Sequence, residues 1–171
     1  MSEREAWLRG PLPGVPPLLM PAAHALVGAG EDLARAAAGL SPEQLWARPA
    51  GVASVGFHLR HVAGILDRLL TYARGEPLTD AQLAYLRAEP DPGDPAPGVD
   101  DLLASAERAI ERALDQIRAT PESSLPDPRG VGRLQHPSTV HGLLFHAAEH
   151  AQRHTGQVVT LARIVQDPRR G

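Results

Sequence analysis

The sequence predicts an all-α protein, an antiparallel four-helix bundle, on three observations. Four long stretches carry apolar residues at steps of three and four, which is the spacing of one helix face. Most of the 17 prolines gather around these stretches, at residues 11–21, 42–49, 90–97 and 121–137. Proline disrupts a helix interior, so these clusters indicate connections. No segment alternates convincingly as a strand would, and only residues 133–136 are candidates for a short strand.

The first long helix is predicted from about Pro21 to Gly39. Its apolar face consists of Ala22, Leu26, Ala29, Leu33 and Ala37. Ser41 then matches the N-cap of a short helix, because Pro42 suits the first helical position and Glu43 supplies an acidic first turn. A short helix is therefore expected between the first two long ones.

The second long helix is predicted from about Ser54 to Arg74, with Gly75 at its C-cap. Its apolar face consists of Val55, Leu59, Val62, Leu66 and Leu69. Another short helix is expected near residues 79–88. The proline-rich run over residues 89–98 then forms a stiff connection between the second and third long helices.

The third long helix is predicted to begin after Asp100, and Ser138 or Thr139 is expected to cap the fourth. The third helix should bury Leu103, Ala106, Ile110, Ala113, Leu114 and Ile117. The fourth carries Val140, Leu143, Ala147, His150, His154, Gln157, Leu161 and Ile164 at alternating three- and four-residue steps. Such spacing is typical of the seam of a helix in a bundle.

The chain is expected to form a single domain over residues 1–171. Residues 1–15 are expected to be an N-terminal extension, and residues 165–171 a flexible C-terminal tail. No run approaches the length of about 18 apolar residues that spans a bilayer. We therefore expect a cytoplasmic protein without a membrane partner.

The residue types in the chain exclude several kinds of chemistry. Because there is no cysteine, disulfides, thiolate metal sites and cysteine nucleophiles are excluded. All 17 basic residues are arginine, which excludes Schiff-base chemistry and lysine-dependent phosphate binding. The net charge of −3 and the scarcity of aromatic residues are unlike a nucleic-acid-binding surface. No nucleic-acid partner is expected.

Three polar residues of the fourth helix, His150, His154 and Gln157, occupy seam positions where Leu or Ala is usual. Buried polar groups need partners, and histidines four residues apart on a helix can bind one ion together. The second helix could supply a third ligand, and the helical wheel places His58 nearer its apolar centre than His61. The residues alone leave two interpretations open: a metal site, or core histidines bonded to backbone or to one another.

A second pattern overlaps the fourth helix. His146, Glu149 and His150 match His-x-x-Glu-His, the inverted zinc-protease pattern, in which Glu149 would be the general base. That pattern needs a downstream glutamate as third ligand, and no glutamate follows His150. The chain is also too short for such a protease, so we do not favour this interpretation.

Three segments together resemble the DinB/YfiT-like superfamily. They are Ser54-Val-Gly-Phe-His-Leu-Arg-His-Val-Ala63, His150-Ala-Gln-Arg-His-Thr-Gly-Gln157 and Leu40-Ser-Pro-Glu-Gln-Leu-Trp-Ala-Arg-Pro49. The spacing of all four long helices fits as well, so the resemblance covers nearly the whole chain. It implies a four-helix bundle that binds one divalent metal ion through three histidines.

Carried over by position, the three implied ligands are His61, His150 and His154. The motif thus favours His61 over His58, against the helical wheel, and we follow the motif because wheel angles drift near a helix start. His58, His146 and Gln157 are then candidates to line the cavity beside the metal.

The resemblance also implies an activity. Several members of the family are transferases or isomerases that use a low-molecular-weight thiol of the bacillithiol, mycothiol or glutathione type. A thiol in the open coordination position would become a thiolate that attacks an electrophilic small-molecule substrate. We expect zinc or nickel as the metal and a homodimer as the assembly. The alternatives are a hydrolase that uses metal-bound water, and a non-catalytic metal-stabilised stress-response or binding protein.

Overall fold

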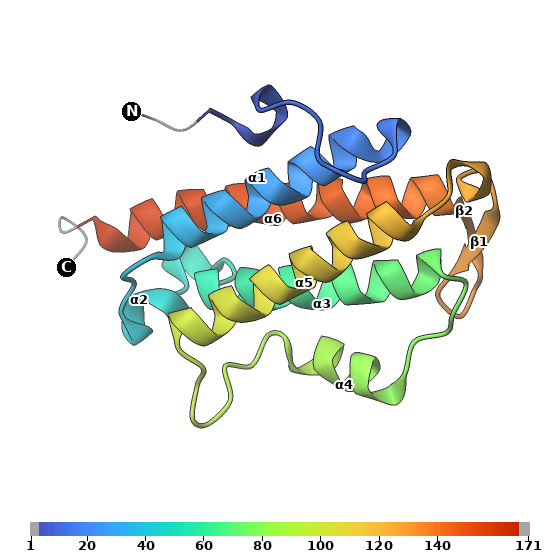
Figure 1. Ribbon diagram of the computed structural model, residues 1–171. Coiled ribbons are helices and arrows are strands. Elements are labelled where there is room, and N and C mark those ends of the chain that lie inside the picture. Colours follow the sequence, from blue (N-terminus) through green and yellow to red (C-terminus); the bar gives the residue numbers. More distant parts are fainter. Residues whose placement is uncertain (1–3, 168–171) are drawn as a thin grey trace.

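The computed structural model describes residues 4–167 and is mostly helical, as the sequence predicts. Four long helices lie alongside one another (Figure 1): α1 (Met20–Ala37), α3 (Val55–Ala73), α5 (Val99–Ala119) and α6 (Val140–Gln166). Both α1 and α3 pack against α5 and α6. The apolar core therefore lies between the four long helices.

The shorter elements connect the long helices. They are α2 (Pro42–Trp46), α4 (Asp80–Ala88) and the 3-10 turns η1 (Ala6–Leu8), η2 (Pro17–Leu19), η3 (Pro49–Gly51) and η4 (Glu122–Ser124). The predicted Ser41 cap is present: the Ser41 hydroxyl accepts from the amide of Gln44, whose side chain accepts from the Ser41 amide in return. Thr79 and Gln82 form the same capping box at the start of α4.

The expectation of an all-α protein is wrong in one place. A small antiparallel hairpin precedes α6, with β1 (Pro128–Val131) paired to β2 (His136–Thr139). The candidate strand at residues 133–136 is mostly the turn of this hairpin, where Gly132 and Gln135 have positive φ angles of 68° and 51°. Each strand has only four residues, too few to show an alternation in the sequence.

The apolar faces predicted for the first two long helices form much of the core. Buried members are Ala22, Leu26, Ala29, Leu33 and Ala37 of α1 and Val55, Leu59, Val62, Leu66 and Leu69 of α3. In α5, Leu102 is buried, whereas Leu103, which was expected in the core, is only partly buried. Leu103 lines a groove between α1 and α5, at the edge of the buried face.

The structure describes part of the predicted N-terminal extension and of the predicted C-terminal tail. Ala6 and Val15 are buried, and Arg9 forms an ion pair of 2.6 Å with Glu31 of α1, so parts of the segment 4–15 pack on the helices. Helix α6 continues to Gln166. Residues 1–3 and 168–171 lie outside the described residues. Within the described chain, none of the helices has both the length and the apolar composition of a membrane span.

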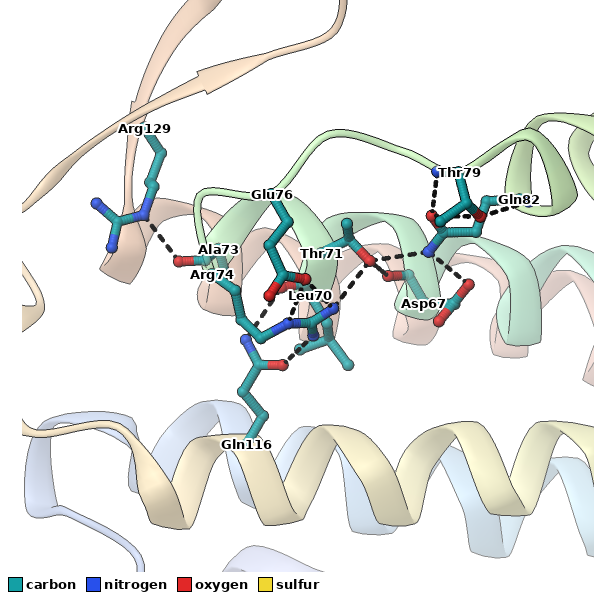
Figure 2. Close-up of polar contacts among 10 residues, drawn as sticks. All are labelled: Asp67, Leu70, Thr71, Ala73, Arg74, Glu76, Thr79, Gln82, Gln116 and Arg129. Atoms are coloured by element: carbon teal, nitrogen blue, oxygen red, sulfur yellow. Dashed lines mark hydrogen bonds and ion pairs between the residues drawn. The ribbon is translucent and has the colours of Figure 1, made fainter.

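Polar side chains at the end of α3 tie the neighbouring elements together (Figure 2). Arg74 donates to the Gln116 side chain of α5 at 2.7 Å, and Gln82 of α4 donates to Asp67 at 2.8 Å. Arg129 of β1 donates to a backbone carbonyl in the last turn of α3 at 2.8 Å. Helices α4 and α5 and strand β1 are therefore all hydrogen-bonded to the C-terminal part of α3.

Candidate metal centre

Helices α3 and α6 bring four histidines together. The Ser54 hydroxyl caps α3, which places His58 and His61 in its first two turns. On α6, His150 and His154 are one turn apart in the middle of the helix. Because α3 packs against α6, the two pairs of rings face each other.

Three ring nitrogens converge at one point of this cluster. His150 Nε2 lies 3.1 Å from His61 Nε2 and 3.1 Å from His154 Nε2. Two nitrogens that each bind a tetrahedral zinc ion at about 2.0 Å are roughly 3.3 Å apart. The three partly buried histidines have ligand atoms close enough together to hold one metal ion. The structure thus assembles the set that the family motif implies.

His58 is part of the cluster but stands behind one of these three residues. Its Nδ1 lies 2.8 Å from His154 Nδ1, on the side of the ring opposite the converging nitrogens. The His58 side chain is buried. Of the two histidines of α3, His61 therefore presents a nitrogen to the shared point, and His58 contacts the back of another ring.

His61 is held from behind by a buried carboxylate. Its Nδ1 lies 2.7 Å from Glu89 Oε2, and the other oxygen of Glu89 accepts from Arg68 at 2.6 Å. Both Glu89 and Arg68 are buried. Since a carboxylate only accepts, His61 donates through Nδ1, so in the neutral form of the ring the lone pair is on Nε2 and faces the cluster. A metal ligand needs this arrangement.

The sequence interpretation missed Glu89 and Arg68. Glu89 opens the proline-rich connection, which was expected to be only a spacer. Arg68 offers a signal that could have been used, because it follows His61 by seven residues, two turns along the same face of α3. An arginine on a buried helix face needs an acidic partner.

His150 makes its polar contacts through Nε2. Among the side chains of residues 4–167, its Nδ1 is the buried polar atom without a hydrogen-bond partner. A single N–H at His150 Nε2 can be donated well to only one of its two neighbouring nitrogens. A divalent cation would accept a lone pair from each ring, so the residues fit such an ion.

Burial also favours the uncharged form of these rings. Burial lowers the pKa of His58 and of His150 to about 4, and that of His154 to about 3. The neighbouring His61 adds to the effect in each case. At neutral pH these three rings are therefore neutral, which is the form that donates a lone pair to a metal.

An aromatic side chain covers one side of the cluster. The ring of Phe57 is stacked on that of His61, with centroids 5.4 Å apart and planes inclined by 13°. The same ring meets His58 edge-on at 5.2 Å. Phe57 therefore gives the site an apolar wall.

The structure places the other two predicted cavity residues differently. His146 is exposed, with its ring 5.3 Å from that of His150 and its Nδ1 3.1 Å from Glu149. His146, Glu149 and His150 form a second group with metal-ligand spacing, but Glu149 is also paired with Arg153.

Gln157 does not join the cluster. It is exposed, and Val158 occupies the buried position in its place. The predicted seam steps by 3.5 residues on average, whereas a straight helix repeats every 3.6, so the buried face drifts by about 20° in each heptad. At Gln157 this drift turns the side chain out of the buried face, whereas Leu161 of the predicted seam stays buried. The expectation of a buried Gln157 is wrong.

Comparison with known proteins gives a family match and no match to a single curated sequence. A family model described as the DinB superfamily matches residues 25–158, which include the four clustered histidines, Glu89 and Arg68. The match covers well over half of the chain. The chain belongs to the DinB superfamily.

Proposed function

We propose that His61, His150 and His154 bind one divalent cation, zinc or nickel, and that the protein is a metal-dependent enzyme that activates a small thiol. The observation that carries the proposal is the convergence of the three Nε2 atoms, with His150 Nε2 at 3.1 Å from each of the other two. The proposal includes an antiparallel arrangement of the four long helices and a homodimer, both supported by the family likeness.

Three imidazole ligands suit a catalytic site because they leave a coordination position open. A cation bound there lowers the pKa of a coordinated thiol or water, so that a nucleophile is available at neutral pH. The chain has no cysteine, so the sulfur of a thiol reaction comes from a cosubstrate. The electrophile is the second small-molecule substrate.

The chain's own residues orient and shield this site. Glu89 holds the ring of His61, and His58 contacts the back of the His154 ring. Phe57 covers the His61 ring and excludes water from that side. The neutral rings of His150 and His154 add no positive charge that would oppose a cation.

The test is a thiol-conjugation assay on the zinc-loaded and nickel-loaded protein. Glutathione, mycothiol and bacillithiol are each offered with a reactive electrophile, and the consumption of free thiol is followed. His154→Ala should abolish turnover, whereas the matched control His141→Ala, at an exposed position of the same helix, should leave it unchanged. Wild-type protein that binds metal but consumes no thiol above background would contradict the transferase proposal. Ester or amide hydrolysis by the same protein would replace it with a hydrolase.

A further inference from the structure

We propose that Glu89 is a positioning residue, which fixes the tautomer of His61 and thereby sets the metal affinity of the site. The inference rests on the proposed metal site. Its physical basis is a buried chain of three side chains, Arg68, Glu89 and His61, with contacts of 2.6 and 2.7 Å. Glu89 does not touch the converging nitrogens, so it acts only through the His61 ring.

The burial of Glu89 keeps its hydrogen bonds with His61 and Arg68 in one geometry. Its side chain is 2 % exposed and that of Arg68 is 5 % exposed, so water does not compete for either group. Each carboxylate oxygen has one strong donor, Arg68 for Oε1 and His61 for Oε2. Charge-assisted hydrogen bonds of this kind are short and directional. The His61 ring is therefore held at a fixed angle with Nδ1–H outward and Nε2 inward.

Helix α3 has a slot for this carboxylate. A Cβ atom at Gly64 would lie 2.3 Å from Glu89 Oε1 and 2.7 Å from both Arg68 Nη1 and Tyr85 Cε1. Gly64 lies between His61 and Arg68 in the sequence, within two turns of helix. Only glycine leaves the room in which Glu89 reaches the backbone of α3.

Glu89 also holds α4, the helix that ends just before this residue, against α3. None of the nine residues of α4 is buried, and its leucines, Leu83 and Leu86, are 36 % and 41 % exposed. Beyond the first turn, α4 contacts α3 through Tyr85, whose hydroxyl donates to the Arg60 carbonyl at 3.2 Å. Glu89, the C-cap of α4, is the buried anchor that follows. The position of α4 and the orientation of His61 therefore depend on the same carboxylate.

The substitution Glu89→Gln separates positioning from simple packing. The shape of the side chain is kept, but the amide has one oxygen and one NH2 group. Arg68 donates only, so it selects the amide oxygen and turns the NH2 group toward His61. His61 Nδ1 must then accept, and the proton moves to Nε2. A protonated Nε2 has no lone pair to offer, so a metal ion binds His61 only after that proton has moved, which weakens binding.

The first readout is the tautomer of His61 in the chelator-treated, metal-free protein, measured by long-range 1H–15N correlation NMR. Wild-type His61 should carry its proton on Nδ1, and in Glu89→Gln the proton should be on Nε2. A wild-type His61 with its proton on Nε2 would overturn the proposal. This measurement needs no variant, so the proposal can be refuted even if Glu89→Gln does not fold.

The second readout is the dissociation constant for zinc, measured by competition with a chromophoric chelator. Loss of a group that orients a metal-bound histidine weakens binding by about 10- to 100-fold, and Glu89→Gln should fall in that range. The matched control is Glu76→Gln, an exposed glutamate of the α3–α4 connection that also pairs with an arginine of that region. It should bind zinc as the wild type does.

The outcomes separate this inference from the proposed function. If wild type and Glu89→Gln bind zinc equally well, the positioning role fails and the metal site stands. If the wild type binds no zinc or nickel, the proposed function fails, and the tautomer measurement alone still decides whether Glu89 orients His61. If both glutamate variants lose affinity equally, the effect is general and the positioning role is refuted.

Discussion

The slot for Glu89 predicts opposite effects for two alanine substitutions at helical glycines. Gly64 lies in α3, where an added Cβ would be 2.3 Å from the Glu89 carboxylate. Gly156 lies in α6, where an added Cβ meets no atom within 4 Å. Alanine is the better helix former, so without other contacts both substitutions would stabilise the protein by about 1 kcal/mol.

At Gly64 the steric term should exceed this gain. The new methyl group displaces the Glu89 side chain and leaves Arg68 buried without its partner. Breaking one side of a buried ion pair costs about 3–5 kcal/mol. Subtracting the helix-propensity gain leaves a net loss of about 2–4 kcal/mol for Gly64→Ala. For a chain of this length, that loss lowers the Tm by roughly 4–16 °C.

Urea unfolding followed by far-UV circular dichroism measures both free energies. Gly156→Ala should raise the free energy of unfolding by about 1 kcal/mol, and Gly64→Ala should lower it. If Gly64→Ala is as stable as Gly156→Ala, the carboxylate does not occupy the slot and the reasoning is refuted. Equal destabilisation by both substitutions would show that the propensity argument does not apply to this protein.

Three further predictions concern single contacts. Thr139→Ala removes the hydroxyl that accepts from the Gly142 amide at the start of α6, so urea unfolding should show a loss of about 1 kcal/mol; an unchanged midpoint would show that the cap contributes nothing. His58→Leu removes the contact with His154 but no proposed ligand, so competition titration should show zinc binding weakened by about 10- to 100-fold and not abolished; complete loss would place His58 among the ligands. Burial raises the pKa of Tyr85 above the value of about 10 that tyrosine has in an unfolded chain. The stability that the neutral Tyr85 hydroxyl contributes is therefore complete below pH ~10 and is lost as the pH rises further. The urea midpoint of Tyr85→Phe should therefore fall less between pH ~8 and ~11 than that of the wild type, and identical slopes would contradict the burial argument.

Much of the helical fold can be predicted because its signals are local. Ser41 and Thr139 act as caps through hydrogen bonds to residues three positions on, so their effect is visible in a short stretch of sequence. Leu26 and Leu59 are buried because the 3.6-residue period puts them on one helix face. The hairpin before α6 has no comparable signal, since its strands depend on pairing with each other.

The candidate site was predictable where the family motif specifies it and not elsewhere. The motif gives His61, His150 and His154, and the structure brings their nitrogens together. The helical wheel alone favoured His58, which contacts His154 from behind. Glu89 was missed because its contact with His61 spans 28 residues and two helices, and no local pattern reports such a pairing.

Elemental analysis of the protein, purified without a histidine tag and then exposed to zinc and nickel in turn, tests the central claim most directly. The convergence of three histidine nitrogens predicts about one divalent ion for each wild-type chain, retained by the exposed-position control His141→Ala and lost in His154→Ala. A wild-type protein that takes up neither metal would contradict the account, and the four clustered histidines would then be a hydrogen-bonded part of the core.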